Sequence, residues 1–308
     1  MKVGLMLGGG GAKGSYQVGL LEVLEKSKLI DKIDIISGAS IGAINGYFYL
    51  GSDAKTLKKV WEYGIENNPI SKKVNLKDHG LFKMDILKEI DNQFTNKDKI
   101  YNCEKDLYLI TTEVKSPSLL SIVQKSSWVE RVFHLNKLQS PIDYVISSAS
   151  IPVVFGANEL DDKYFIDGGL VNNNPIDVLI EKGAKLIFVA PLEKPINYEE
   201  IADADVTIVE LTPDAIFPHK LLDQLKSIVG FDLEEMANKI EYGNYVAAEM
   251  LKECVNEGVL TLEGDNFKIN KLKKGLNVIK VPAYVEATVS NMIYIHDIKR
   301  KEKEDGNS

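Results

Sequence analysis

The sequence is poor in cysteine and has no long apolar runs. Only Cys103 and Cys254 occur in 308 residues, and they form neither a C-x-x-C pair nor a zinc-binding spacing. We therefore expect two reduced thiols without a disulfide, as is usual in the cytosol. No apolar run approaches the roughly 18 residues of a membrane span, and the stretch after Met1-Lys2 is too short for a secretory signal. These absences predict a cytoplasmic protein.

Positive charge is also scarce. The 37 Lys and Arg residues against 45 Asp and Glu residues give a formal net charge of −8. This balance argues against a nucleic-acid-binding protein and against delocalised attraction to anionic membranes. No cluster of His, Cys or acidic residues has the spacing of metal ligands, so we expect neither a metal nor another cofactor. The remaining composition, 44% hydrophobic and 27% charged, is that of an ordinary globular protein.

Residues 33–50 have a pattern that is typical of a reactive serine. A β-branched run over residues 33–36 predicts a buried strand, and it leads through Gly38-Ala39-Ser40-Ile41-Gly42 into an apolar, helix-compatible segment. A G-x-S-x-G between a strand and a helix is the context of a nucleophile elbow. Gly38 and Gly42 would leave room for the strained turn that exposes Ser40. A glycine-rich turn without a reactive role is the simpler alternative.

A second glycine-rich loop follows the first expected strand, residues 2–7. Gly9-x-Gly11-x-x-Gly14 matches the dinucleotide-binding fingerprint, with Asp31 or Asp34 near the usual acidic position. A P-loop is excluded because Ser15-Tyr16 follows Gly14 in place of Lys-Ser/Thr. The loop also suits an oxyanion hole, since consecutive glycines let backbone N–H groups approach a tetrahedral oxygen. In a parallel sheet both loops emerge at one edge, which would bring Gly10 and Gly11 beside Ser40.

A serine nucleophile needs a base, and the histidines are poor candidates. None of the four histidines lies in a glycine-rich or recognisable catalytic setting, so we interpret each as a surface or structural residue: His79, His134, His219 and His296. Asp167 is the stronger candidate, because it ends a short expected strand and precedes Gly168-Gly169. Two glycines after a carboxylate allow a close approach to another loop. A tight turn is the alternative here.

The rest of the chain alternates strands and helices, which predicts a mainly parallel sheet covered on both faces. Further strands are expected over residues 107–112, 119–124, 131–135, 164–166, 186–190, 206–211 and 276–282. Further helices are expected over residues 16–24, 53–66, 84–94, 142–148 and 283–299 and from residue 233. We expect a catalytic α/β core over 1–215 with a cap or lid inserted at 67–105, a mostly helical extension packed on it over 216–298, and a charged flexible tail over 299–308.

Five blocks of this sequence occur in the order seen in patatin-like phospholipases, and the chain resembles that family over about residues 2–212. The blocks are Gly9–Gly14, Gly38–Gly42, Ser148–Phe155, Asp167-Gly168-Gly169 and Val171–Pro175. In the C-terminal part, Glu241-Tyr242-Gly243 resembles the family more weakly. The resemblance implies a three-layer α/β/α fold and a Ser40–Asp167 dyad without a catalytic histidine. It also implies an oxyanion hole from the N–H groups of Gly10, Gly11 and Ala12.

The chain departs from the family at Lys13, where many members have Arg. Both side chains are cationic, but Lys lacks the planar fork of Arg, so only the detailed role of this residue is in doubt. The resemblance implies a lipid acyl ester as the substrate, a phospholipid or lysophospholipid, and calcium-independent activity. Two other classes stay open: a catalytically silent regulator or adaptor of the same fold, and a nucleotide-binding oxidoreductase that uses residues 9–14.

Contact with a membrane surface, at its inner face, is a further hypothesis. Residues 51–77 contain six lysines against three acidic residues, and Trp61 could serve as an anchor. We favour the alternative, a solvated lysine face with a buried Trp61. The sequence makes no prediction of the oligomeric state.

Overall fold

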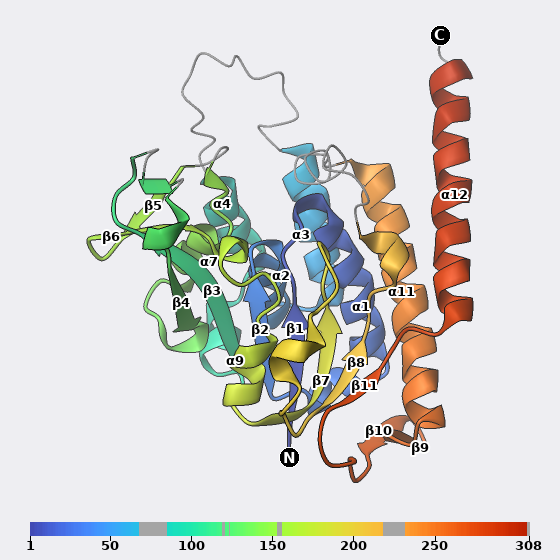
Figure 1. Ribbon diagram of the computed structural model, residues 1–308. Coiled ribbons are helices and arrows are strands. Elements are labelled where there is room, and N and C mark those ends of the chain that lie inside the picture. The colour runs from blue at the N-terminus through green and yellow to red at the C-terminus, as the bar shows by residue number, and fades with distance from the viewer. Residues whose placement is uncertain (68–84, 119–120, 123, 153–155, 218–231, 307–308) are drawn as a thin grey trace.

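The computed structural model describes residues 1–67, 85–118, 121–122, 124–152, 156–217 and 232–306 (Figure 1). Within them, a nine-stranded sheet has the order β11-β8-β7-β1-β2-β3-β6-β5, and β4 pairs with β3. The strands are β1 (Lys2–Leu7), β2 (Ile35–Ala39), β3 (Asp106–Val114), β4 (Val129–His134), β5 (Asn158–Leu160), β6 (Lys163–Asp167), β7 (Ala184–Ala190), β8 (Thr207–Glu210) and β11 (Asn277–Ile279). The pairs from β11 to β3 are parallel, whereas β4, β5 and β6 add antiparallel pairs at the other side.

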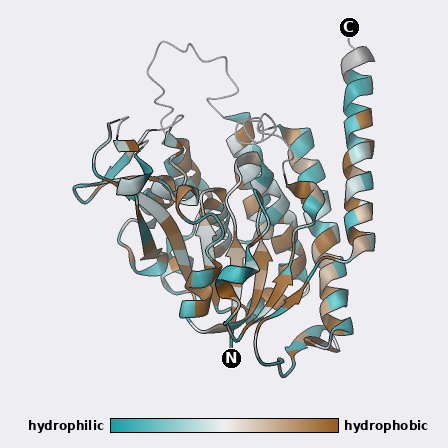
Figure 2. Ribbon diagram, in the orientation of Figure 1, coloured by the Kyte–Doolittle hydropathy of each residue, from teal (hydrophilic) through white to brown (hydrophobic). Residues whose placement is uncertain are grey.

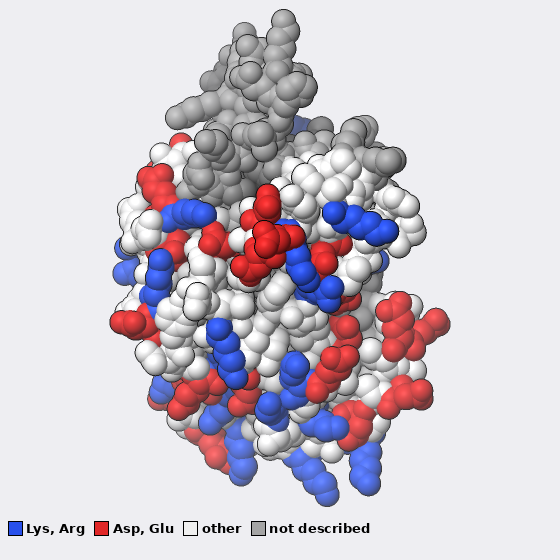
Figure 3. Space-filling model, turned by 90° about the vertical axis from the view of Figure 1, so that its left-hand side faces the viewer, with Lys and Arg blue, Asp and Glu red and all other residues white. Residues whose placement is uncertain are grey.

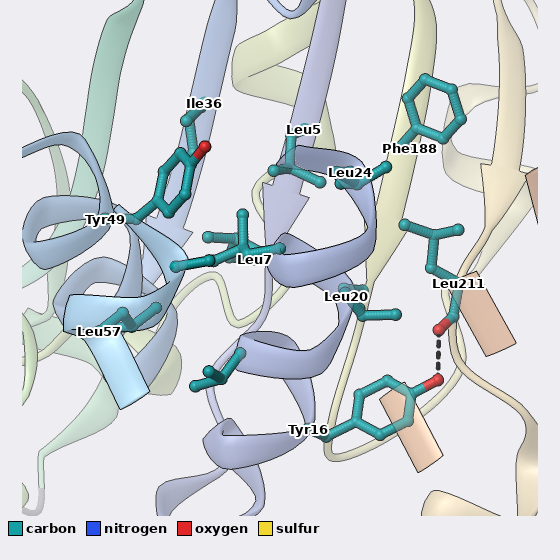
Figure 4. Close-up of a cluster of buried hydrophobic side chains, with 14 of the residues drawn as sticks. Leu5, Leu7, Tyr16, Leu20, Leu24, Ile36, Tyr49, Leu57, Phe188 and Leu211 are labelled. Carbon is teal, nitrogen blue, oxygen red and sulfur yellow. Dashed lines mark hydrogen bonds between the residues drawn. The ribbon is translucent and has the colours of Figure 1, made fainter. Parts of the chain in front are cut away.

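The central strands are apolar on both faces, because helices cover both. Along β1, Leu5 and Leu7 belong to one hydrophobic cluster, whereas Met6 between them belongs to a second cluster on the opposite face. This alternation follows from the two-residue period of a strand. Figure 4 shows part of the larger cluster, in which Tyr16 also donates a hydrogen bond to the Leu211 carbonyl oxygen at 2.6 Å. Figure 2 shows the same pattern as hydrophobic strands inside a more hydrophilic shell.

Helices form the outer layers. The larger cluster includes residues of α1 (Ser15–Lys26), α2 (Ile41–Gly51), α3 (Ala54–Glu66), α4 (Asp85–Phe94), α7 (Pro141–Ser148), α11 (Leu233–Asn256) and α12 (Ala283–Gly306). The opposite face packs against α9 (Ile176–Glu181), and α5 (Lys97–Tyr101) follows α4. A short hairpin, β9 (Leu260–Glu263) and β10 (Asn266–Ile269), lies outside the main sheet. The three-layer α/β/α fold with a mainly parallel sheet and a helical C-terminal region is confirmed.

Helix α11 lies against α1 at very short range. A Cβ on Gly19 would lie 2.1 Å from the Ile240 carbonyl oxygen, and a Cβ on Gly243 would lie 2.1 Å from the Tyr16 carbonyl oxygen. Only residues without a side chain allow two helix backbones to come this close. Glu241-Tyr242-Gly243, which weakly resembles the family, therefore lies where α11 crosses α1.

The structure differs from the expectations at the C-terminal end and at several short elements. Helix α12 continues to Gly306, where we expected a flexible tail from 299, because Arg300 and Lys303 pair with Glu235 and Glu234 of α11 at 2.6 and 2.7 Å. Strand β11 joins the main sheet beside β8 although it belongs to the expected helical extension. Within 119–124, the described pair 121–122 is helical and not a strand.

The expected lid region and lysine-rich region lie partly outside the described residues, from 68 to 84. In the described part, the Tyr47 hydroxyl donates to the buried Asp91 of α4 at 2.7 Å, which ties α4 to α2. Trp61 is only 6% exposed and donates to Asn45 Oδ1 at 2.9 Å. Trp61 is therefore buried, as the favoured alternative predicted, and it is not available as a membrane anchor. Both cysteines are free.

The described surface carries charges of both signs. On the face in Figure 3, Lys and Arg side chains are interspersed with Asp and Glu side chains. On this face, the charges therefore do not form a continuous basic surface of the kind that attracts polyanions. No helix in the described part of the chain combines the length and the apolar character needed to cross a bilayer.

Candidate active site

Ser40 lies in a strained turn between β2 and α2. Its φ of 53° and ψ of −124° are unusual for a residue with a side chain. The flanking glycines are required by close packing: a Cβ on Gly42 would lie 2.0 Å from the Leu7 carbonyl oxygen, and one on Gly38 would lie 2.8 Å from the Ala43 nitrogen. The turn thus has the geometry of a nucleophile elbow, and it places Ser40 at the start of a helix.

Asp167 reaches Ser40 from the end of β6. The Ser40 hydroxyl donates a hydrogen bond to Asp167 Oδ2 at 2.6 Å, and the Gly169 N–H donates to Asp167 Oδ1 at 2.8 Å. Gly168 permits this approach, because a Cβ there would lie 2.0 Å from the Ile110 carbonyl oxygen. The structure therefore brings together the serine and the aspartate that the sequence singled out.

The Asp167 carboxyl is nearly inaccessible to solvent, with 6% of the residue exposed. Burial is the main cause that raises its pKa to about 6, and the negative charge of Glu193 acts in the same direction. The hydrogen bonds from Ser40 and Gly169 favour the charged form and partly oppose this shift. A carboxylate with this pKa is a better proton acceptor than a free aspartate, yet is ionised at neutral pH.

Residues at the end of α7 and just after it form hydrogen bonds with both Ser40 and Asp167. Ser148 Oγ accepts a hydrogen bond from the Ser40 N–H at 3.0 Å, and the Ser150 carbonyl oxygen accepts one from the Asp167 N–H at 2.9 Å. On β3, the Thr112 hydroxyl donates to the Asp167 carbonyl oxygen at 2.8 Å. The sequence identified Ser148–Phe155 only by its resemblance to a family block, and residues 153–155 lie outside the described residues.

The glycine loop lies beside Ser40. A Cβ on Gly9 would come within 3.0 Å of Ser40 Cβ. The loop then enters a short 3-10 turn, Gly11–Gly14, in which Gly11 has a positive φ of 56°. Among the described residues, the N–H groups of Gly10, Gly11 and Ala12 have no hydrogen-bond acceptor. Unpaired N–H groups are expected at the start of a helical turn, where they can bind an anion.

A buried polar network lies behind this loop. Gln17 Nε2 donates to the carbonyl oxygens of Gly8 and Ala190, at 2.9 and 3.1 Å. Asn45 Nδ2 donates to the Gly14 carbonyl oxygen and to Gln17 Oε1, both at 2.9 Å. Sequence reasoning missed Gln17 and Asn45; the available signal was a lone amide inside each of two apolar helices. The network holds both ends of the glycine loop.

Lys13 is buried beside the loop and forms an ion pair. Its Nζ lies 2.8 Å from Glu193 Oε1, and only 6% of the residue is exposed. Burial lowers the pKa of Lys13, while the hydrogen bond and charge of Glu193 oppose the change. Glu193 follows β7, and no motif in the sequence indicated its role.

The described histidines make contacts elsewhere. His134 Nε2 lies 2.8 Å from Asp106 at the start of β3, and His296 lies 2.6 Å from the Tyr242 hydroxyl on α11. Asp34 accepts a hydrogen bond from the Val3 N–H at 2.7 Å, at the strand end opposite the glycine loop. In a dinucleotide-binding site, the acidic residue that binds the ribose would have to lie at the same end of the strands as the glycine loop. His79 and His219 lie outside the described residues.

Comparisons with known proteins agree with these motifs. A family model described as "Patatin-like phospholipase" matches residues 5–180. Patatin-like phospholipase domain-containing protein 7 of Mus musculus is 28% identical over 203 residues, which cover 60% of this chain and 13% of that protein. Lysophospholipase NTE1 of Scheffersomyces stipitis is 25% identical over 203 residues, covering 64% of this chain and 12% of that protein. The match thus spans a small part of these relatives.

Solved structures are more distant. VipD from Legionella pneumophila has a TM-score of 0.38 at 14% identity, covering 97% of this chain and 66% of that one. ExoU, in its heterodimeric complex with SpcU from Pseudomonas aeruginosa, has a TM-score of 0.43 at 15% identity, covering 83% and 52%. The family model, by contrast, runs from β1 through Ser40 and Asp167 into α9 and covers more than half of the chain. This chain belongs to the patatin-like phospholipase family.

Proposed function

We propose that this protein is a serine acyl hydrolase that cleaves carboxylic ester bonds of lipids with a Ser40–Asp167 dyad. The observation that carries the proposal is the 2.6 Å hydrogen bond from the Ser40 hydroxyl to a buried carboxylate. A nucleophile and a base within hydrogen-bond reach are the minimum that covalent acyl transfer requires. Family membership supports the choice of a lipid ester.

In the first step, Asp167 accepts the proton of the Ser40 hydroxyl while Oγ attacks the ester carbonyl carbon. The carbonyl oxygen becomes an oxyanion, which the N–H groups of Gly10, Gly11 and Ala12 stabilise by hydrogen bonds. Lys13 lies behind the loop, where the ion pair with Glu193 offsets its positive charge. The tetrahedral intermediate then collapses: the ester C–O bond breaks, Asp167 returns its proton to the leaving alcohol, and the acyl group stays on Ser40.

In the second step, a water molecule replaces the alcohol. Asp167 accepts one proton from the water as its oxygen attacks the acyl-serine carbonyl carbon, and the same N–H groups stabilise the new oxyanion. Collapse breaks the bond to Ser40 Oγ, which regains the proton from Asp167. The products are a free carboxylic acid and the resting enzyme, so neither a metal nor another cofactor takes part in the proposed reaction.

The proposed substrates are phospholipids or lysophospholipids, cleaved as by a phospholipase A. Two relatives are named a patatin-like phospholipase and a lysophospholipase, which supports this class. We further propose a cytoplasmic enzyme that meets its lipid at a membrane surface. The free thiols of Cys103 and Cys254 support a reducing compartment.

Labelling with a fluorophosphonate probe tests the dyad. Wild-type protein should be labelled on one serine and should hydrolyse lysophosphatidylcholine or a short-chain ester. Ser40→Ala, confirmed as folded by circular dichroism, should lose both labelling and hydrolysis. Labelling that persists in Ser40→Ala would contradict the assignment. A folded wild type that is neither labelled nor active would instead be a catalytically silent member of the family.

A further inference from the structure

The peptide planes around Gly9 are held by named partners. The plane between Gly8 and Gly9 is held at both ends: Gln17 Nε2 donates to the Gly8 carbonyl oxygen at 2.9 Å, and the Gly9 N–H donates to the Asn173 carbonyl oxygen at 3.2 Å. The next plane, between Gly9 and Gly10, is held at its carbonyl end, where Asn173 Nδ2 donates to the Gly9 carbonyl oxygen at 3.2 Å. Asn173 therefore contacts Gly9 through both its backbone and its side chain.

This contact decides where the Gly10 N–H points. In a planar trans peptide, the C=O of one residue and the N–H of the next point in opposite directions, and the described residues contain no cis peptide bond. Because the Gly9 carbonyl oxygen faces the Asn173 amide, the Gly10 N–H must point away from it. Among the described residues, that N–H has no acceptor of its own, so the Asn173 side chain is the hydrogen bond that sets this plane.

The neighbouring residues offer little resistance to rotation of the plane. Gly9 and Gly10 flank it, and glycine has access to backbone conformations on both sides of φ = 0. The plane after it is held separately, since the Lys13 N–H donates to the Gly10 carbonyl oxygen at 3.2 Å. Loss of the Asn173 amide would therefore free one peptide unit and leave those beside it in place.

Asn173 also lies against the loop that carries Asp167. A Cβ on Gly9 would lie 2.3 Å from Asn173 Oδ1, and a Cβ on Gly169 would lie 2.4 Å from the same oxygen. The Gly169 N–H is the group that holds Asp167 Oδ1 at 2.8 Å. The amide of Asn173 is thus packed between the loop of the proposed base and the loop of the proposed oxyanion hole.

We propose that Asn173 is a positioning residue for acyl transfer: its side-chain amide orients the Gly9–Gly10 peptide so that the Gly10 N–H faces the developing oxyanion. The proposal rests on the proposed function, because it assigns the Gly10 N–H to the oxyanion. Asn173 does not itself touch the reacting atoms. Asn173 should therefore stabilise the transition state, in which negative charge develops on the carbonyl oxygen of the substrate. It should not contribute to binding of the substrate in its ground state.

The three consecutive asparagines provide a matched control. Asn172 makes its side-chain hydrogen bonds to Glu130 and Asp177, at 3.0 and 2.9 Å. Asn173→Ala removes the donor to Gly9, Asn173→Asp replaces it with an acceptor that repels the Gly9 carbonyl oxygen, and Asn172→Ala removes the neighbouring amide. For each variant we would measure the second-order rate of fluorophosphonate labelling, kcat and KM on a short-chain ester, and the thermal unfolding midpoint.

The expected labelling rates fall roughly tenfold in Asn173→Ala and roughly hundredfold in Asn173→Asp, the latter comparable to loss of one oxyanion-hole donor. In both variants kcat should fall with the labelling rate, while KM stays within about threefold of wild type. Asn172→Ala should stay within about threefold of wild type in every kinetic quantity. A trifluoromethyl ketone, which forms an oxyanion on reaction with Ser40, should lose affinity in Asn173→Asp, whereas the parent methyl ketone should not.

Labelling of Asn173→Ala and Asn173→Asp at the wild-type rate would overturn the proposal, as would equal losses in Asn172→Ala. A rise in KM without a fall in kcat would also overturn it. If Asn173→Asp does not fold, Asn173→Ala carries the test. A wild type that is labelled but cleaves no lipid would refute the lipid substrate alone, because the labelling rates still test Asn173. A wild type that is not labelled would overturn both proposals.

Discussion

Replacement of Asp167 by Asn should abolish hydrolysis and at the same time stabilise the protein. Asp167 is buried, and its pKa is raised to about 6 chiefly because burial disfavours the ionised form. An amide of the same shape carries no charge that must be desolvated. In the Asp167→Asn variant, the amide oxygen can still accept from the Gly169 N–H, and the amide nitrogen can donate to Ser40 Oγ, so both hydrogen bonds can be kept.

The size and the sign of the change in stability follow from the raised pKa of Asp167. Well below pH 3.8 the carboxyl is protonated in both states, and Asp167 contributes no electrostatic penalty. Between pH 4 and 6 the unfolded chain ionises first, so the stability of the folded state falls as the pH rises, and it levels off above pH 6. A pKa raised from 3.8 to about 6 corresponds to a penalty of about 3 kcal/mol at pH 8.

Urea unfolding at pH 4, 5, 6 and 8 measures this penalty. We expect Asp167→Asn to be about 1–3 kcal/mol more stable than wild type at pH 8, with the difference falling below about 1 kcal/mol at pH 4. Asp203→Asn, at an exposed aspartate, is the matched control and should show little change. An Asp167→Asn variant that is less stable than wild type at pH 8, or a gain that does not shrink toward pH 4, would refute the argument from burial.

Three further predictions follow from the structure. The kcat/KM of wild type should rise about tenfold per pH unit below pH 6 and level off above it, because ionised Asp167 is the base; a flat pH–rate profile would contradict this assignment. Gly243→Ala should destabilise the protein by roughly 1–3 kcal/mol or more in urea unfolding, because its Cβ meets the Tyr16 carbonyl oxygen; wild-type stability would mean that the helices separate freely. Arg300→Glu should increase amide hydrogen exchange near residue 300 and change global stability by under about 1 kcal/mol, since its pairing with Glu235 is exposed; unchanged exchange would show that the pair does not hold the helix end.

Local sequence patterns were enough to predict the part of the site around Ser40. The strand before Ser40, the helix after it and the glycines on either side lie within one short stretch, so their roles are visible in sequence order. Asp167 was also predictable, since two glycines directly follow the carboxylate. The hydrogen bond between Ser40 and Asp167 joins residues 127 positions apart, and their pairing was expected from the resemblance to the family.

The supporting residues were not predictable in the same way. Gln17 bonds Ala190 across 173 residues, and Asn173 bonds Gly9 across 164. Asn173 lies in the Val171–Pro175 block and Gln17 in no block, and neither position implies the partner of its side chain. Glu193 is one acidic residue among many, and its pairing with Lys13 depends on the register of β7 beside β1. At the C-terminus, mixed charge indicated a frayed tail, whereas ion pairs with α11 extend α12 along it.

The place of β11 in the sheet has a consequence for synthesis of the protein. Both proposed catalytic residues have left the ribosome long before Asn277–Ile279 are made, yet β8 has no outer neighbour until these residues arrive. At roughly 5–20 residues per second, the interval between β8 and β11 is on the order of ten seconds. For that time the nascent chain presents an unpaired strand edge, the feature that other chains can join. Synthesis as far as β11 and protection from aggregation are therefore coupled in this fold.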